Sequence, residues 1–565
     1  MSLRNLFRNI FLRNGWGKDG KKGPDDTISC STGSPGGKIP ERPGIPDAGL
    51  PVSEAPAQDG HRKAAPQGLT ENAGSREVPP SLPMKTGETK AARKKLFLNV
   101  GIDFGTSFTK VVYRDIHSGR SCVLGFGSSN GSLPEFYIPS AVTFGGGKIY
   151  FAWGAGREME GDSIGITSFK ICMACRGKSV LTGGGCRLSL EVKGRPCFTV
   201  HSGTGDITVE PSDIAALYLA YVIGVVRERL IGRFGKNVEL SLTWNMCAPI
   251  DHYEKEHILG EFRRSLFLGE KLAGRVKDGM GLDDALRMLS TEKSSWIQLP
   301  DESEITTFIV PETYAAVISY VNSRQAEEGL YVVVDVGSGT TDVSFFRLSL
   351  GPKKVIFYEA RTGLIGVDDI ARDIILHSLA GSDAGVQKGL ADTREIGAVR
   401  NTIALGSAEG NGSRVFLTGR QAYQVGVEKY DAILGENATR VFDHYRKTFA
   451  GAFRKEKSEG RWKEFSMFTI GGGCRISRIR LSAEKKPWDR IDQVVQKKLV
   501  FLDDLSIDQD TGKVAQAVDL PHDLVAIAYG LSFHTGEYPE FVLPRDVDPF
   551  SPSLPYREIK DYEDQ

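Results

Sequence analysis

GIDFGTS at residues 101–107 and DVGSGTTD at residues 335–342 are the stretches that decide the expected fold. Each follows an apolar run typical of a buried strand, and each places an aspartate, glycines and hydroxyl side chains in one tight turn. Glycine lets backbone N–H groups approach phosphate oxygens, and an aspartate tolerates phosphate when a divalent cation lies between them. The first glycine turn (103–107) and the second glycine turn (335–342) therefore predict two matching lobes that clamp a nucleotide and magnesium.

A third glycine turn, GGGCR at residues 471–475, follows another apolar run at 465–470. Around the three turns, short strand patterns alternate with helical patterns, which predicts an α/β fold. Strands are expected at residues 97–103, 109–115, 138–144, 148–153, 238–244, 331–336, 343–348, 355–359 and 465–470. Helices are expected at residues 214–234, 315–326 and 524–532, and residues 366–455 are expected to be mostly helical.

The composition is that of a globular chain with a basic N-terminal tail. The 565 residues are 40% hydrophobic and carry no formal net charge, so more than one core can form. Residues 1–95 hold sixteen Lys and Arg against ten Asp and Glu, which leaves the remainder mildly acidic and argues against a specific nucleic-acid-binding body. No apolar run reaches the roughly eighteen residues of a membrane span. Eight cysteines without a signal peptide favour reduced thiols and a cytoplasmic location.

The N-terminal region divides into two segments. Residues 1–22 place Leu and Phe at helical spacing with Arg between them, which predicts a basic amphipathic segment. Such a segment suits a membrane surface through residues 3–16, and it equally suits a partner-docking peptide or an unstructured terminus. Residues 23–95 are rich in Pro and Gly with almost no aromatic residue, so a disordered linker is expected. We then expect lobe I at 96–303, lobe II with a helical subdomain and a return to lobe I at 304–535, and a tail at 536–565.

With these segments in order, the chain from residue 96 to residue 532 resembles the ATPase domain shared by actin, the seventy-kilodalton heat-shock chaperones (DnaK-type) and the sugar kinases, most closely the chaperones. The three glycine turns carry the resemblance, together with PETYAA at 311–316 and AIAYG at 526–530, which resemble the two connecting helices. SFK at 168–170 and GVDD at 366–369 are softer matches. The resemblance implies a two-lobed actin-like fold of duplicated ribonuclease H-like lobes with a nucleotide cleft between them. No counterpart of the chaperones' peptide-binding domain follows residue 532.

The turns and the resemblance together give a candidate site for ATP and Mg²⁺. Asp103 and Asp335 would hold magnesium, largely through water. The resemblance implies that Lys170 places the attacking water and that Glu312 and Asp342 orient it or the ion. Donors and close-approach positions for the nucleotide would be Gly105, Thr106, Ser107, Gly337, Ser338, Gly339, Thr340, Thr341, Gly366, Gly472 and Gly473, with Arg475 stacking on the base.

Each assignment has a plainer alternative. The two aspartates could cap turns, Lys170 could be solvated, Glu312 could be a first-turn helix acid, and Arg475 could pair with a surface acid. Ser338 stands where the chaperones usually have a third glycine. The cysteines of the segment around residues 171–197 could bind zinc with four thiolates or remain buried free thiols. Free thiols are favoured, because structural zinc sites usually have two closely spaced ligand pairs and only one such pair is present here. These four are Cys172, Cys175, Cys186 and Cys197.

The favoured function is a chaperone-like ATP-binding protein that hydrolyses ATP slowly to ADP and phosphate and uses lobe closure as a switch for an unknown protein partner. Three alternatives stay open at this point. The chain could form membrane-associated actin-like filaments, phosphorylate a small molecule, or bind nucleotide as a scaffold without hydrolysis. Sedimentation with ATP would separate a filament from a switch, and phosphate release would separate a scaffold from both.

Overall fold

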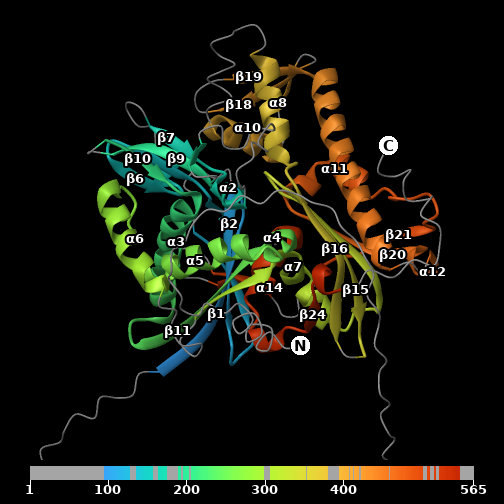
Figure 1. Ribbon diagram of the computed structural model, residues 1–565, viewed down its shortest axis with the longest axis horizontal. Coiled ribbons are helices and arrows are strands. Elements are labelled where there is room, and N and C mark those ends of the chain that lie inside the picture. The colour runs from blue at the N-terminus through green and yellow to red at the C-terminus, as the bar shows by residue number, and fades with distance from the viewer. Residues whose placement is uncertain are drawn as a thin grey trace, which may run out of the picture. The chain divides into compact units, whose positions relative to one another are not determined.

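The computed structural model describes residues 94–547 apart from 127–134, 157–162, 175–188, 193–194, 203–204, 298–305, 352, 380–392, 406–407, 411–412, 419–421, 457–458, 500–504, 509–513 and 517–520. Two main sheets organise this part of the chain, and helices pack around each of them (Figure 1). The predicted N-terminal segment and nearly all of the predicted linker lie outside the described residues, as does the predicted tail beyond residue 547.

The first sheet contains the first glycine turn and has the strand order β13-β11-β1-β2-β3-β22-β23, with β4 paired to β2. In β1, the residues from Leu98 onward are buried, as expected for a central strand covered on both faces. Its strands are β1 (Lys94–Phe104), β2 (Phe108–Asp115), β3 (Ser121–Leu124), β4 (Ile138–Pro139), β11 (Val238–Ala248), β13 (Thr307–Pro311), β22 (Ser506–Asp508) and β23 (Val514–Gln516).

The second sheet contains the second glycine turn and has the order β21-β20-β14-β15-β16-β24. Its first five strands repeat the pattern of the first sheet: a central strand has two parallel strands on one side and an antiparallel pair on the other. The repeat puts each glycine turn at the same place in its sheet. The strands are β14 (Gly329–Val336), β15 (Thr341–Ser349), β16 (Lys354–Gly363), β20 (Glu464–Ile470), β21 (Gln493–Gln496) and β24 (Glu540–Val542).

Two helices, α7 (Glu312–Asn322) and α14 (His522–Leu531), cross between the sheets and contact both (Figure 1). They approach so closely that a Cβ atom at Gly530 would overlap the carbonyl oxygen of Ala315. This contact gives a physical reason for glycine in the alanine-rich segment at residues 526–530. The two crossing helices therefore connect the halves that carry the first and second turns.

Helices and small sheets cover the remaining faces. Around the first sheet lie α2 (Phe169–Ala174), α3 (Pro211–Phe234), α4 (Ile250–Tyr253), α5 (Glu256–Leu272), α6 (Leu282–Ile297), β5 (Val142–Gly145), β6 (Lys148–Phe151), β7 (Ile164–Ile166), β8 (Ser189–Val192), β9 (Arg195–Ser202), β10 (Gly205–Val209), β12 (Met280–Gly281) and η1 (Gly154–Gly156). Around the second lie α8 (Val367–Ser378), α10 (Thr393–Leu405), α11 (Val427–Lys455), α12 (Glu459–Trp462), α13 (Ser477–Ala483), β17 (Ala408–Gly410), β18 (Ser413–Leu417), β19 (Ala422–Gly426) and η3 (Gly472–Arg475).

The second sheet is buried on both faces, and β14 demonstrates it. Tyr331 and Val333 pack into the core shared with the first sheet, whereas Val332 and Val334 pack into a separate core beneath α8, α10 and α11. Because successive strand residues point to opposite faces, an uninterrupted apolar run is what a doubly covered strand requires. This run is the pattern from which the strand at 331–336 was predicted.

Residues 366–455 are mostly helical, as predicted, but the stretch between α10 and α11 is not. Strands β17, β18 and β19 form a three-stranded sheet there. In β19, Tyr423 and Val425 are buried between exposed neighbours, the alternation of a half-buried strand. This small sheet packs one face against the helical layer, which we define as the helices that cover the second sheet: α8, α10, α11 and α13. Its strands are short, so the helical patterns on either side dominate the sequence.

Several element positions also differ from the expected boundaries. Strand β13 belongs to the first sheet although lobe II was expected to begin at residue 304, because it pairs in parallel with β11. Helix α7 begins at Glu312, directly after Pro311, rather than at residue 315. The expected tail contains β24, which pairs with β16. After β24 comes η5 (Pro544–Asp546), where Arg545 binds Glu254 beside α4 through its backbone N–H and its guanidinium.

None of the helices in the described part of the chain has the length and apolar character required to cross a membrane.

Candidate functional site

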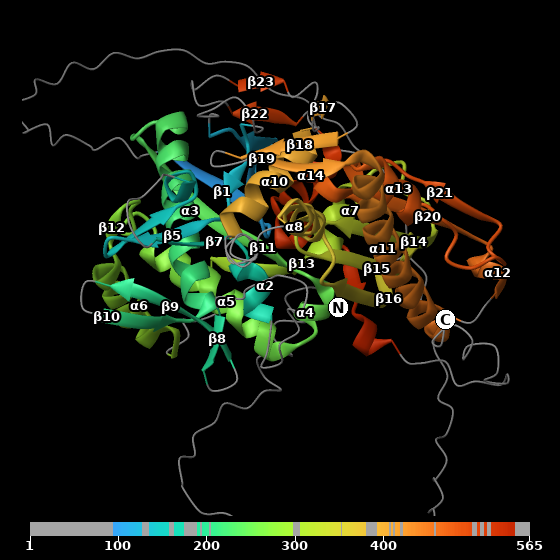
Figure 2. The same cartoon turned by 90° about the horizontal axis from the view of Figure 1, so that it is seen from above.

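The three glycine turns converge on one pocket of about 650 Å³, a volume in the range of small-molecule sites. The lining comes from both sheets, from α7 and α14, and from the helical layer over the second sheet. Figure 2 views these elements from above, and α10 contacts β7. The predicted site residues among the lining are Asp103, Gly105, Thr106, Ser107, Lys170, Glu312, Asp335, Gly337, Ser338, Thr340, Asp342, Gly472, Gly473 and Arg475.

Two lysine–carboxylate pairs lie in this pocket. The ammonium of Lys110 is 2.6 Å from a carboxylate oxygen of Asp103, and the ammonium of Lys170 is 3.3 Å from one of Glu312. All four side chains are largely buried, at 15% exposure or less. For Lys170, burial works against the charged form, but the attraction of Glu312 and neighbouring acids outweighs it and raises the pKa. The same balance, led by Asp103, raises the pKa of Lys110. Both lysines are therefore charged at neutral pH.

The second turn holds carboxyl groups without such cations. Burial, followed by repulsion from Glu312, raises the pKa of Asp335 well above its usual range and that of Asp342 to about 7. Asp342 accepts hydrogen bonds from Thr362 at 2.5 Å and from Thr340 at 3.1 Å. Within the described residues, no hydrogen bond or ion pair reaches the Asp335 side chain. These surroundings favour protonation at the second turn, which a bound cation would reverse.

The residues present fit a divalent cation. The pocket lining has six carboxyl groups and six cationic side chains. Four of the carboxyl groups and the two lysine ammonium groups lie close enough to interact, and this cluster has a net charge of −2 when all are ionised: Asp103, Glu312, Asp335, Asp342, Lys110 and Lys170. Asp103 and Asp335 are the acids at the ends of the two central strands, and Asp335 is the one without a partner in the described structure. Asp103 also lies near Glu312 and the thiol of Cys247, with one ligand atom of each within 4.8 Å of the others. Magnesium prefers oxygen ligands and retains water, which suits the carboxylates rather than the thiol.

The first turn offers hydroxyl groups to the pocket. Ser107 Oγ is buried and has no hydrogen-bond partner within the described structure. Leaving a buried hydroxyl unpaired is costly, and a bound ligand would remove that cost. In the second turn, the Gly337 N–H donates to the carbonyl oxygen of Thr340 at 2.8 Å, which fixes the loop shape. Ser338 lines the pocket where a glycine was expected by resemblance, so the small side chain is accommodated.

Three residues that were predicted to contact the nucleotide are not among those that line the pocket. The buried hydroxyl of Thr341 donates to the carbonyl oxygen of Ile365 at 2.8 Å, so it is not directed to a ligand. Gly366 is the N-cap of α8, and its N–H donates to Asp369 at 2.9 Å. Gly339 lies against Ile171 of α2. These residues shape the second turn instead of facing the pocket.

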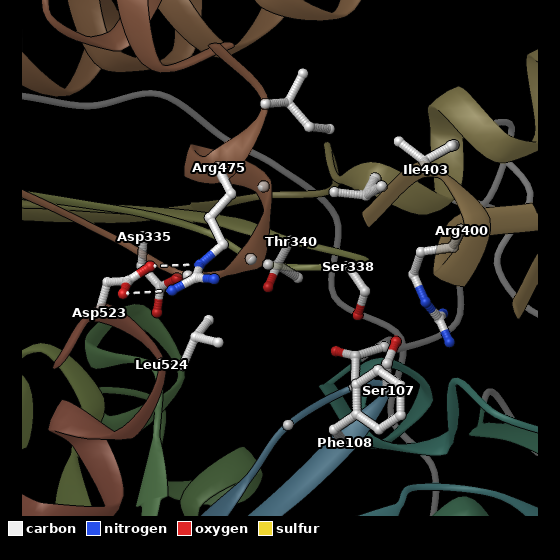
Figure 3. Close-up of a pocket in the computed structure, with 18 of the residues that line it drawn as sticks. Ser107, Phe108, Asp335, Ser338, Thr340, Arg400, Ile403, Arg475, Asp523 and Leu524 are labelled. Carbon is white, nitrogen blue, oxygen red and sulfur yellow. Dashed lines mark hydrogen bonds and ion pairs between the residues drawn. The ribbon is translucent and has the colours of Figure 1, made fainter. Parts of the chain in front are cut away.

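The third turn depends on a glycine with unusual backbone geometry. Gly471 has φ +83°, which disfavours other residues, and a Cβ atom there would overlap the Asp335 carboxylate. After it, Arg475 makes two hydrogen bonds of 2.9 Å with Asp523 of α14 (Figure 3). The ion pair was the alternative interpretation of Arg475, and here it coexists with a place in the pocket wall. Asp523 therefore orients the side chain that was expected to stack on a base.

The cysteine segment is only partly described. Cys172 is buried in α2 and takes part in no disulfide within the described residues. Cys175 and Cys186 lie outside the described residues, as does the side chain of Cys197. Zinc binding by these four cysteines stays a prediction.

Among the pocket residues that sequence reasoning missed are Lys110, Tyr137, Arg400 and Asp523. Lys110 had a usable signal, because it lies on the strand that follows the first turn and pairs directly with Asp103. The other three reach the pocket from segments that are distant in sequence, and only the folded chain brings them to the turns.

The protein therefore has a mixed α/β fold with a pocket that is lined by charged side chains from all three glycine turns. Comparison with known proteins shows that part of its sequence is similar to chaperones. A stretch of 75 residues, 13% of this chain, is 43% identical to "Chaperone protein HscA homolog" of Bordetella pertussis, covering 12% of that protein. A stretch of 178 residues, 30% of this chain, is 29% identical to "Chaperone protein HscA" of Pectobacterium carotovorum subsp. carotovorum, covering 27% of it. No protein-family model matches the chain. The similarity is partial, and it agrees with the resemblance to the seventy-kilodalton chaperones at that level.

Proposed function

We propose that this chain is a chaperone-like ATP-binding protein with a two-lobed, actin-like architecture. One observation carries the proposal: the same strand–turn–strand unit occurs in both sheets, and both turns line one pocket in which four carboxyl groups lie near two lysine ammonium groups. The partial similarity to proteins named HscA chaperones supports the same class. Magnesium held by Asp103 and Asp335 would supply the positive charge that phosphate oxygens need beside these acids.

The other charged residues have roles that follow from their positions. Lys170, held by Glu312, would present its ammonium to the terminal phosphate and orient a water molecule. Asp342, whose pKa is raised to about 7 by burial and by Glu312, would accept a hydrogen bond or a proton from that water near neutral pH. Ser107 and Thr340 would donate hydrogen bonds to phosphate oxygens. Hydrolysis by such an arrangement rests on positioning and charge, and we propose that it is slow.

Closure of the helical layer over the pocket would convert nucleotide state into a change of surface for a protein partner. The pocket includes residues of α10, α11 and α13 as well as the first turn, so a ligand there touches both sides at once. Because the chain covers about a quarter or less of the relatives' length, the chaperones' own activities and partners are not transferred to it.

Titration of the full chain with ATP and Mg²⁺, followed by phosphate release, tests the proposal. We expect magnesium-dependent binding, and slow release that falls by two to three orders of magnitude in Asp103→Ala and Asp335→Ala. Asp284→Ala is the matched control, since Asp284 pairs with Arg287 on the surface. Release that is equal in all four proteins would exclude hydrolysis at this site, and absence of nucleotide binding would exclude the proposal itself.

A further inference from the structure

A continuous series of side-chain contacts begins at Asp103 and leaves the pocket along its rim. Lys110, which pairs with Asp103, has its ammonium 5.9 Å from the centre of the Tyr137 ring. Tyr137 precedes β4 and stacks face to face on Phe108, with ring centres 4.6 Å apart and planes only 15° from parallel. Phe108 is the first residue of β2, immediately after the first turn. The aromatic pair is thus held between a cation and the pocket rim.

The far face of this pair is covered from the other half of the molecule. The guanidinium of Arg400, on α10, lies 5.6 Å from the centre of the Phe108 ring. Figure 3 shows Arg400 reaching from its helix toward Phe108, with Ser107 and Ser338 close by. Helix α10 also contacts β7, so the helical layer meets the first half at two places. Arg400 side-chain exposure is only 10%, which strengthens a cation–π contact.

The series ends at the second turn. Arg400 donates a 2.7 Å hydrogen bond to the Asp368 carboxylate at the start of α8. The backbone N–H of Asp368 in turn donates to the carbonyl oxygen of Ser338 at 2.8 Å. The first and second turns are therefore joined around the pocket by a path that is separate from the two crossing helices.

We propose that Lys110, Tyr137, Phe108 and Arg400 form a stacked column that couples the position of α10 to the position of the Lys110 ammonium in the pocket. Lys110 contacts the anionic part of the ligand. Tyr137, Phe108 and Arg400 also line the pocket, and within the column they position Lys110. The role of Lys110 deepens the proposed function and rests on it. The contacts that form the column do not require the ligand, so the coupling can be tested in the ligand-free chain.

The coupling acts in both directions. When α10 moves away, Phe108 loses the guanidinium on its outer face, and the stacked rings no longer confine the lysine. A ligand anion that fixes the ammonium therefore favours the closed α10, and a closed α10 favours the ligand by the same factor. A surface arginine would not act in this way, because its contacts end in solvent.

The test is amide hydrogen exchange in α10 of the ligand-free full chain. Tyr137 touches Lys110 and Phe108 but lies one step removed from Arg400, so Tyr137→Leu should accelerate exchange in residues 393–405 by about fivefold. Tyr137→Phe keeps the ring and should restore the wild-type rate. Tyr221→Leu removes a different stacked tyrosine, paired with Phe151, and should leave α10 unchanged. Equal α10 exchange in Tyr137→Leu and wild type would overturn the column.

Titration with ADP and Mg²⁺ supplies the second measurement. Phe108→Leu and Arg400→Lys should each weaken binding about fivefold, and the double variant should be no weaker than either one, because both break the same path. Losses that multiply would overturn the coupling. Wild-type protein that binds no ADP would refute the proposed function, and with it the ligand role of Lys110, while the exchange experiment would still decide whether the column exists.

Discussion

The first and second glycine turns occupy equivalent places in two repeated sheets, yet their aspartates meet opposite neighbours. In the first sheet, Asp103 pairs across the strands with Lys110; in the second, Asp335 pairs across with Asp342. The carboxylate of the first turn is neutralised within its own hairpin, whereas the second hairpin brings two carboxyl groups together without a cation between them. Two copies of one backbone unit can thus differ in electrostatic role, because a single cross-strand partner decides whether the aspartate is paired with a cation. The first half provides a fixed cation, the ammonium of Lys110, whereas the carboxyl groups of the second half favour binding of a metal cation.

The largest expected effect separates the two aspartates by the sign of their contribution to stability. Asp103→Asn leaves a buried lysine without its counter-ion and should lower the free energy of unfolding by about 3 kcal/mol. Asp335→Asn removes a carboxylate that burial and neighbouring acids disfavour, so the metal-free chain should melt at a higher temperature. Thermal unfolding in EDTA measures both, with Asp284→Asn as the surface control. Shifts of the same sign would abolish the distinction between the turns.

A second test uses pH. Burial and Glu312 raise the pKa of Asp342 from 3.8 to about 7 in the folded chain. The folded state therefore keeps a proton that the unfolded state has lost, so this group's contribution to stability is complete below about pH 4 and disappears as the pH rises to about 7. Relative to Asp342→Asn, the metal-free wild type should lose stability between pH 5 and 7 and change little above it. Melting curves of both proteins across this range would contradict the assignment if they stayed parallel.

The smallest effects concern hydroxyl groups at the two turns. Ser107→Ala removes a hydroxyl without a described partner, so it should leave ligand-free stability nearly unchanged and weaken ADP binding by about threefold to tenfold. Thr341→Val removes the donor to Ile365 and should cost about 1 kcal/mol of stability while sparing affinity. Denaturant unfolding and titration calorimetry separate the two. An affinity loss confined to Thr341→Val would reverse the assignments.

Local chemistry explains what could be predicted from the sequence. The strands at residues 97–103 and 331–336 were recognisable because a doubly covered strand is apolar throughout, and the turns were recognisable because glycine and aspartate have few substitutes there. Fourteen of the predicted site residues line one pocket, and all of them except Lys170 and Glu312 belong to the three turns. Thr341 was assigned to the ligand because a sequence gives the residue type but not the direction of its side chain. Arg400 was missed because its role depends on Phe108, a partner from the other half of the fold.

Strand β24 has a consequence beyond the architecture. Residues 540–542 occupy backbone groups of β16 at Lys354–Ile356 that would otherwise form an open sheet edge. An open edge can recruit a strand from another molecule and begin self-association. Strand β24 becomes the edge in its place, and its three residues offer a strand from another molecule little backbone with which to pair. The hydrogen bonds of Arg545 to Glu254 hold the segment that follows β24 against the other half of the protein.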